Sequence, residues 1–73
     1  MDLSEHPFDG AALRDVRLQK GMSQKELASL CHISASCLSG IESGRFSPSL
    51  RTMANICRQL GVDAGLLIRP FSG

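Results

Sequence analysis

Five residues whose side chains can cap a helix are spread along this chain of only 73 residues: Asp9, Ser23, Ser34, Ser49 and Asp63. Each precedes apolar residues at helical spacing, and a polar side-chain oxygen before such a run is a signal of a helix start. No stretch alternates apolar and polar residues with β-branched enrichment, so the sequence contains no strand signal. The spacing predicts an all-α fold, a compact domain of five short helices joined by tight connections.

The extent of each predicted helix follows from these starts and from the residues that stop it. Ser23 and Glu26 have the spacing of a capping box, the strongest start signal in the chain. Gly21, Gly44 and Gly61 are suited to left-handed stops. Helices are predicted over residues 10–20, 24–31, 34–44, 50–60 and 63–68, the last ended by Pro70. The residues expected to be buried are Leu13, Val16, Met22, Leu27, Ala28, Cys31, Leu38, Ile41, Leu50, Met53, Ile56, Cys57 and Leu60.

Charge separates the beginning of the chain from the remainder. Residues 1–9 form a predicted acidic N-terminal tail, followed by a folded domain over residues 10–70 and a short C-terminal tail at 71–73. All eight Lys and Arg residues lie in residues 11–73, against only four Asp and Glu residues. A mildly basic domain permits nucleic-acid binding but does not require it.

Cysteine usage and hydropathy indicate the compartment. The chain has three cysteines, an odd number that provides no disulfide framework. The N-terminus carries acidic residues where a secretory signal would be basic, and no apolar run approaches the length of a membrane span. We therefore expect a cytoplasmic protein with reduced thiols.

Cys31, His32 and Cys37 are the residues that could suggest a metal site or a nucleophile. Their spacing does not match the common zinc patterns, and Cys31 occupies a core position of its predicted helix. The side chains of adjacent residues on a helix point away from each other, so Cys31 and His32 do not form a nucleophile–base pair. We expect no metal site, no cofactor and no catalytic residue.

The segment from Gln24 to Ile41 is the most informative for function. It predicts two short helices joined by a turn of about three residues, with small Ala28 where the helices must approach closely. This arrangement lets one helix project while the other braces it. A generic pair of packed helices could share the same pattern.

Further motifs decide between these interpretations. The chain resembles the Cro/repressor-type (XRE-like) helix-turn-helix family of phage repressors and bacterial transcriptional regulators. The matching residues are 13–17 (LRDVR), 21–28 (GMSQKELA), Ile33–Ser34, Leu38, 41–45 (IESGR), 48–50 (PSL) and 60–62 (LGV). The resemblance implies a lambda-repressor-like DNA-binding domain whose recognition helix is the segment Ser34–Gly44.

The resemblance also implies roles for individual residues. Residues expected to face the bases are Ala35, Ser36 and Ser39. Residues expected to contact DNA phosphates are Ser23, Gln24, Lys25, Ser43 and Arg45. Arg17 and Glu42 resemble the partly buried ion pair that ties the first helix of the family to the third. Arg14 and Lys20 are either solvated side chains or further phosphate contacts.

Three departures from the family pattern affect this expectation. His32 replaces the usual glycine of the turn, at a cost of about 1 kcal/mol. The recognition helix contains no Arg, Lys, Gln or Asn, the side chains that discriminate bases by bidentate hydrogen bonds. Gly40 within that helix is expected to cost about 1 kcal/mol relative to Ala. Specificity would therefore need a dimer on two half-sites, water bridges or DNA shape.

The sequence thus predicts a DNA-binding transcriptional regulator, a repressor or controller that acts as a homodimer on double-stranded DNA. The alternative is a protein-interaction module, such as the antitoxin half of a toxin–antitoxin pair or a phage anti-regulator. The acidic tail and the recognition helix without base-reading side chains favour that alternative. Four apolar residues near the C-terminus either cap the core or form a homodimer patch: Leu66, Leu67, Ile68 and Phe71.

Overall fold

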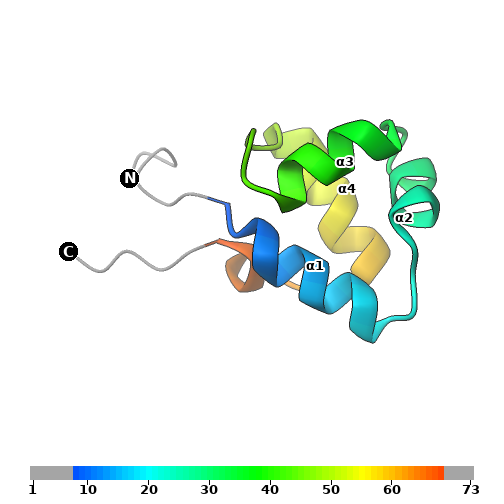
Figure 1. Cartoon of the computed structure of the whole chain (residues 1–73). Coiled ribbons are helices and arrows are strands. Elements are labelled where there is room, and N and C mark those ends of the chain that lie inside the picture. Colours follow the sequence, from blue (N-terminus) through cyan, green and yellow to red (C-terminus); the bar gives the residue numbers. More distant parts are fainter. Residues whose placement is uncertain (1–7, 69–73) are drawn as a thin grey trace.

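A computed structural model describes residues 8–68, which form four α-helices followed by a short 3-10 helix. In order these are α1 (Gly10–Gln19), α2 (Gln24–Leu30), α3 (Ala35–Glu42), α4 (Leu50–Leu60) and η2 (Ala64–Leu67). α3 packs against both α1 and α2, and α4 packs against α2 and η2 (Figure 1). The predicted all-α fold is confirmed.

Four of the five predicted caps make the expected side-chain hydrogen bond. Ser23 and Glu26 form the capping box: the Ser23 hydroxyl accepts from the Glu26 N–H at 3.0 Å, and Glu26 Oε1 accepts from the Ser23 N–H at 3.1 Å. The other three caps accept from the residue three positions along: Asp9 from Ala12 at 3.1 Å, Ser34 from Cys37 at 2.9 Å and Ser49 from Thr52 at 3.2 Å. These local contacts account for the positions of the helix starts.

The first three helices all end in a Schellman motif, in which a left-handed residue follows the C-cap. The left-handed residues are Gly21, His32 and Gly44, with φ of 71°, 59° and 83°. In each motif the following N–H bonds back to a helix carbonyl: Met22 to Arg17 at 3.1 Å, Ile33 to Ala28 at 3.0 Å and Arg45 to Gly40 at 2.9 Å. Each helix therefore stops short of its predicted end, because the residue before the left-handed one is the C-cap.

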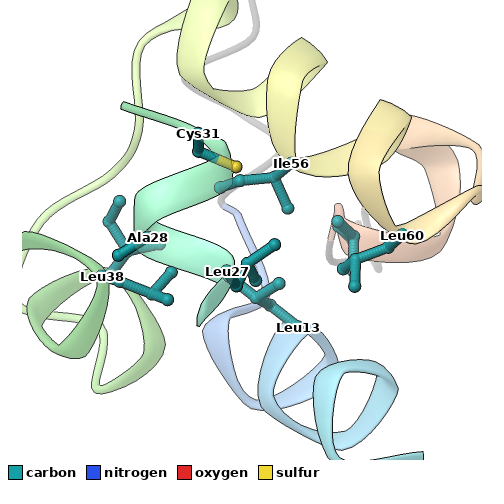
Figure 2. Close-up of a cluster of buried hydrophobic side chains, with 9 residues drawn as sticks. Leu13, Leu27, Ala28, Cys31, Leu38, Ile56 and Leu60 are labelled. Carbon is teal, nitrogen blue, oxygen red and sulfur yellow. The ribbon is translucent and has the colours of Figure 1, made fainter. Parts of the chain in front are cut away.

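The core is aliphatic and draws on every element. Figure 2 shows Leu13 of α1 and Leu27 of α2 meeting Ile56 and Leu60 of α4, with the Cys31 thiol close to Ile56. The complete set of buried apolar residues is Leu13, Leu27, Ala28, Cys31, Leu38, Ile41, Ile56, Leu60 and Leu67. Of the eight buried positions predicted between residues 10 and 44, six are in this set, whereas Val16 and Met22 are only half-buried and pack at its edge.

The predicted buried stripe of α4 is too long. Ile56 and Leu60 are buried and Met53 and Cys57 are half-buried, but Leu50 is 62% exposed. Leu50 is the first residue of α4 and directly follows the mostly exposed loop after α3.

The predicted fifth α-helix is a 3-10 helix of four residues, and Asp63 makes no side-chain capping bond. It ends because Ile68 is extended and forms an isolated antiparallel bridge with Phe8, while the Asp9 N–H donates to the Leu67 carbonyl at 2.6 Å. This pairing joins the two ends of the described part. Most of the predicted acidic tail, as well as Pro70 and Phe71, lies outside the described residues.

α1 begins in unusually close contact with α3. A Cβ added to Gly10 would lie 2.3 Å from the Ile41 carbonyl oxygen and 2.6 Å from that of Glu42. Only glycine therefore lets the start of α1 sit against the end of α3. None of the helices between residues 8 and 68 has the length and hydropathy that a membrane span requires.

Candidate nucleic-acid interface

α2 and α3 are joined by a tight turn centred on His32. Its φ of 59° is the left-handed conformation that the sequence predicts for this position. Ala28, in the last turns of α2, is buried where the chain folds back on itself. The result is a short braced helix pair in which α2 supports α3 (Figure 1).

α3 is exposed at its start and covered toward its end. Ala35 and Ser36 in its first turn are exposed, and Ser39 is half-buried. The buried residues are Leu38, Gly40, Ile41 and Glu42. The three residues expected to face bases are thus exposed or half-buried.

A network of polar side chains joins the last turn of α3 to α1 and α2. The Arg17 guanidinium donates from Nε to Glu42 Oε2 at 2.7 Å and from Nη2 to Glu42 Oε1 at 3.1 Å. Its Nη1 donates to the Met22 carbonyl at 2.7 Å, and Gln24 Nε2 donates to Glu42 Oε1 at 3.0 Å. Every buried side-chain nitrogen or oxygen in the described part has a hydrogen-bond partner. The structure therefore brings the predicted Arg17–Glu42 pair together and adds Gln24 to it.

Gln24 is the first residue of α2, as the sequence predicts, and its side chain makes one contact that the sequence does not predict. It is half-buried and donates to Glu42, while the expected phosphate contact stays a prediction. A primary amide has two N–H donors, so one remains for a further partner. The Gln24 side chain can therefore bond Glu42 of α3 with one N–H and a further partner with the other.

An open hollow of about 500 Å³ lies between α1, α2 and α3. It gathers predicted phosphate, base-facing and ion-pair residues on one surface, together with a further cation, Arg14, whose role the sequence leaves open. The lining residues are Arg14, Arg17, Ser23, Gln24, Ser39, Glu42 and Ser43. Lys25 and Arg45 are exposed on the flanking segments.

Gly40 is explained by the loop that follows α3. A Cβ at this position would lie 2.2 Å from Cζ of Phe46. Ala at this position would require the Phe46 ring, at the end of a half-exposed side chain, to move. Sequence reasoning missed Phe46, and a glycine inside a helix six residues before an aromatic residue was the available signal.

Two of the three cysteines lie in surroundings that disfavour the thiolate. Burial raises the pKa of the Cys31 thiol, and burial together with the charge of Asp63 raises the pKa of Cys57. A raised pKa disfavours the reactive thiolate. Within residues 8–68, no three side chains of His, Cys, Asp or Glu come together as a possible metal site.

A short turn between a bracing helix and a partly free helix defines a helix-turn-helix domain. The sequence pattern of the family described as helix-turn-helix matches residues 13–67, so the chain belongs to the helix-turn-helix family. The resemblance to helix-turn-helix regulators is confirmed at this level.

Known relatives show how this domain is used elsewhere. The ImmF control region 10 kDa protein of Bacillus phage phi105 is 36% identical over 58 residues, which are 80% of this chain and 64% of that protein. The restriction-modification controller protein C.AhdI from Aeromonas hydrophila has a TM-score of 0.74 and 32% identity, over 78% of this chain and 86% of that chain. The hydroxypropylphosphonic acid epoxidase from S. wedmorenis has a TM-score of 0.77 and 29% identity, over 84% of this chain but 32% of that chain. The chain thus spans less than two thirds of the phage relative and about a third of the enzyme.

Proposed function

We propose that this chain is a DNA-binding transcriptional regulator, a repressor or controller, that inserts the segment Ser34–Gly44 into the major groove. The observation that carries the proposal is that α3 exposes Ala35 and Ser36 in its first turn, while Arg17 and Gln24 hold Glu42 in its last turn. In a helix-turn-helix, the second helix is the one that enters the groove. The names of the phage and Aeromonas relatives, a control region protein and a controller protein, support a regulatory role.

Phosphate contacts surround α3 on two sides in this proposal. Ser23, Gln24 and Lys25 lie at the start of α2, and Ser43 and Arg45 lie directly after α3. Lys25 and Arg45 are exposed cations, and Gln24 retains one amide N–H. Contacts of this kind fix the register of a protein on DNA without reading its sequence.

Base recognition rests on small side chains. Ser36 and Ser39 each form single hydrogen bonds with several bases, and Ala35 contacts a thymine methyl group. Because no bidentate base contact is available, one domain discriminates weakly. Selectivity therefore comes from two half-sites, from water or from DNA shape.

A homodimer supplies the second half-site. Leu66 is 55% exposed on η2, whereas Leu67 is part of the core. Leu67 thus caps the core, whereas Leu66 is available for contact with a second copy. Such a dimer places its two α3 helices one DNA turn, about 34 Å, apart.

The test is DNA binding measured by fluorescence anisotropy at two salt concentrations, with duplexes obtained by in-vitro selection. We expect symmetric selected sites, and about tenfold weaker binding for Arg45→Ala and for Gln24→Ala. Arg58→Ala, which removes an exposed arginine from α4, is the matched control and should change the Kd by less than about twofold. Absence of binding at any salt concentration by a confirmed dimer would refute the proposal.

A protein-interaction module, such as an antitoxin or a phage anti-regulator, is the second candidate. It is favoured by the absence of Arg, Lys, Gln and Asn from α3. Co-purification of a toxin-like protein from the native host, in amounts that displace DNA, would support it. The two functions are compatible, because a regulator can also bind a protein partner.

We propose no catalytic role for this chain. The epoxidase relative contains this fold over only 32% of its length. The thiol of Cys31, the best-placed nucleophile by type, is buried with a raised pKa.

A further inference from the structure

The loop after α3 is tied to a single backbone carbonyl of that helix. The Gly40 oxygen accepts from the Arg45 N–H at 2.9 Å and from the Phe46 N–H at 3.4 Å. The Ser43 hydroxyl donates to the same oxygen at 3.1 Å. The backbone that carries Arg45 is therefore held against the last turns of α3.

An aromatic ring occupies the space next to this carbonyl. A Cβ at Gly40 would lie 2.2 Å from Cζ and 2.3 Å from Cε2 of Phe46, so the ring lies against the bare α-carbon. Gly40 is buried as a result, while Phe46 itself remains 48% exposed. The ring occupies the space that a Cβ at position 40 would take, so a larger residue there requires the ring to move.

The ring also contacts the cation that precedes it. The Arg45 guanidinium carbon lies 5.9 Å from the centre of the Phe46 ring, which is within the range of a cation–π interaction. Arg45 is otherwise exposed and takes part in no salt bridge within the described residues. The ring is therefore the one side-chain contact found for its charged group in that part of the chain.

We propose that Gly40 and Phe46 are positioning residues that hold the Arg45 guanidinium ready for a DNA phosphate at the end of α3. The inference rests on the proposed function, in which Arg45 contacts the DNA backbone. α3 contributes no cation of its own, so the placement of Arg45 matters for docking this helix. A side chain that is already restrained loses less conformational entropy when it binds.

A double-mutant cycle on a duplex of about 30 base pairs, long enough for two half-sites, tests the inference. Kd is measured for the parent, Arg45→Ala, Phe46→Ala and the double variant. We expect Phe46→Ala to weaken binding about two- to fivefold in the parent, because an unrestrained Arg45 side chain loses more conformational entropy when it binds. In the Arg45→Ala background the same substitution should have no measurable effect, because the cation that the ring holds is gone. Leu30→Ala, which removes an apolar side chain of similar exposure from α2, is the matched control and should leave Kd unchanged.

Salt dependence separates a positioning residue from a residue that itself contacts a phosphate. Loss of one phosphate contact reduces the magnitude of the slope of log K against log salt by about 0.9. Arg45→Ala should show this reduction, whereas Phe46→Ala should keep nearly the parent slope, because the Arg45 guanidinium is still present to contact the phosphate. If Phe46→Ala does not fold, Phe46→Leu takes its place, because it fills the same space without an aromatic face.

Melting temperature tests the fit of Gly40 to the ring without DNA. Gly40→Ala should lower the melting temperature of the parent but raise it in Phe46→Ala, where the obstructing ring is absent and Ala favours the helix. Equal weakening of DNA binding by Phe46→Ala in both Arg45 backgrounds, or a Gly40→Ala effect of the same sign in both Phe46 backgrounds, overturns the inference. Failure of the parent itself to bind DNA instead overturns the proposed function.

Discussion

α3 and α4 both begin at a serine cap, but different forces fix them in the domain. α3 buries four of its eight residues, and one of these, Glu42, accepts three hydrogen bonds from side chains of α1 and α2. α4 buries only Ile56 and Leu60 among its eleven residues, and both are apolar. One helix is held by directed polar bonds as well as packing, whereas the other is held by packing alone.

Apolar packing and directed hydrogen bonds constrain different aspects of how a helix is placed. Apolar burial is non-directional, so it brings α4 onto the core without specifying its rotation closely. Charge-assisted hydrogen bonds are short and directional, and a bidentate Arg–carboxylate pair adds geometric specificity. The helix proposed to enter the groove is thus the one whose orientation is set by bonds of defined geometry.

Loss of the Glu42 carboxylate should have the largest effect. Glu42→Ala leaves the Arg17 guanidinium, whose side chain is only 7% exposed, without its counter-charge. Removing one partner of a buried pair costs about 3–5 kcal/mol, which is a large part of the stability of a domain of this size. We expect this loss in the free energy of unfolding, measured by urea denaturation followed by circular dichroism. Asp15→Ala, at an exposed acidic residue of α1, is the control and should change stability by less than about 0.5 kcal/mol.

An apolar replacement of the whole pair sharpens the comparison. Arg17→Met with Glu42→Leu should recover most of the lost stability, because such exchanges are often neutral. The same variant should bind DNA more weakly than the parent, since packing alone now holds α3. Recovery of both stability and DNA affinity would show that the directed bonds do not orient this helix.

The next effect should appear on the apolar side. Ile56→Ala removes a fully buried side chain from α4 and should cost about 2–4 kcal/mol through lost burial and a residual cavity. Leu50→Ala on the same helix should change stability by less than about 0.5 kcal/mol, because that side chain is exposed. Thermal melting of both variants measures the difference, and similar losses would show that Leu50 is covered in solution.

A smaller effect is expected at the contact between α1 and α3. Gly10→Ala places a methyl group against the carbonyl oxygens of Ile41 and Glu42, and this overpacking should cost about 1–3 kcal/mol. Gly65→Ala is the matched control, because an added Cβ there meets nothing within 4 Å. Urea denaturation of the two variants should separate them, and equal stabilities would mean that α1 can shift without penalty.

Local signals predicted the parts of this molecule that local contacts determine. The caps of α1 to α4 depend on residues three positions apart, and the left-handed His32 turn depends on its immediate neighbours. The Arg17–Glu42 pair spans 25 residues, so spacing alone does not predict it, and only the family resemblance implied it.

The remaining features depend on packing that no local pattern contains. Leu50 fits the apolar stripe of α4, but whether it is buried depends on which part of α4 the other elements cover. The bond from Gln24 to Glu42 crosses 18 residues and follows from the approach of α2 to α3. The contact between Gly40 and Phe46 depends on the turn that brings the loop back over α3. The helix propensity of glycine alone therefore does not indicate this contact.

The smallest effect should be a pH dependence at the contact between α2 and α4. Burial raises the pKa of Cys31 above its ordinary value of 9.0, and its thiol lies close to Ile56 (Figure 2). The unfolded chain therefore loses this proton at lower pH than the folded chain, so stability is complete below about pH 9 and falls as the pH rises further. Cys31→Ala should flatten this fall in urea unfolding measured from pH 7 to 10, whichever way it shifts stability at neutral pH. Parallel curves for the parent and the variant would instead mean that water reaches the thiol in the folded state, and hence that apolar packing holds α4 more loosely than its two buried residues suggest.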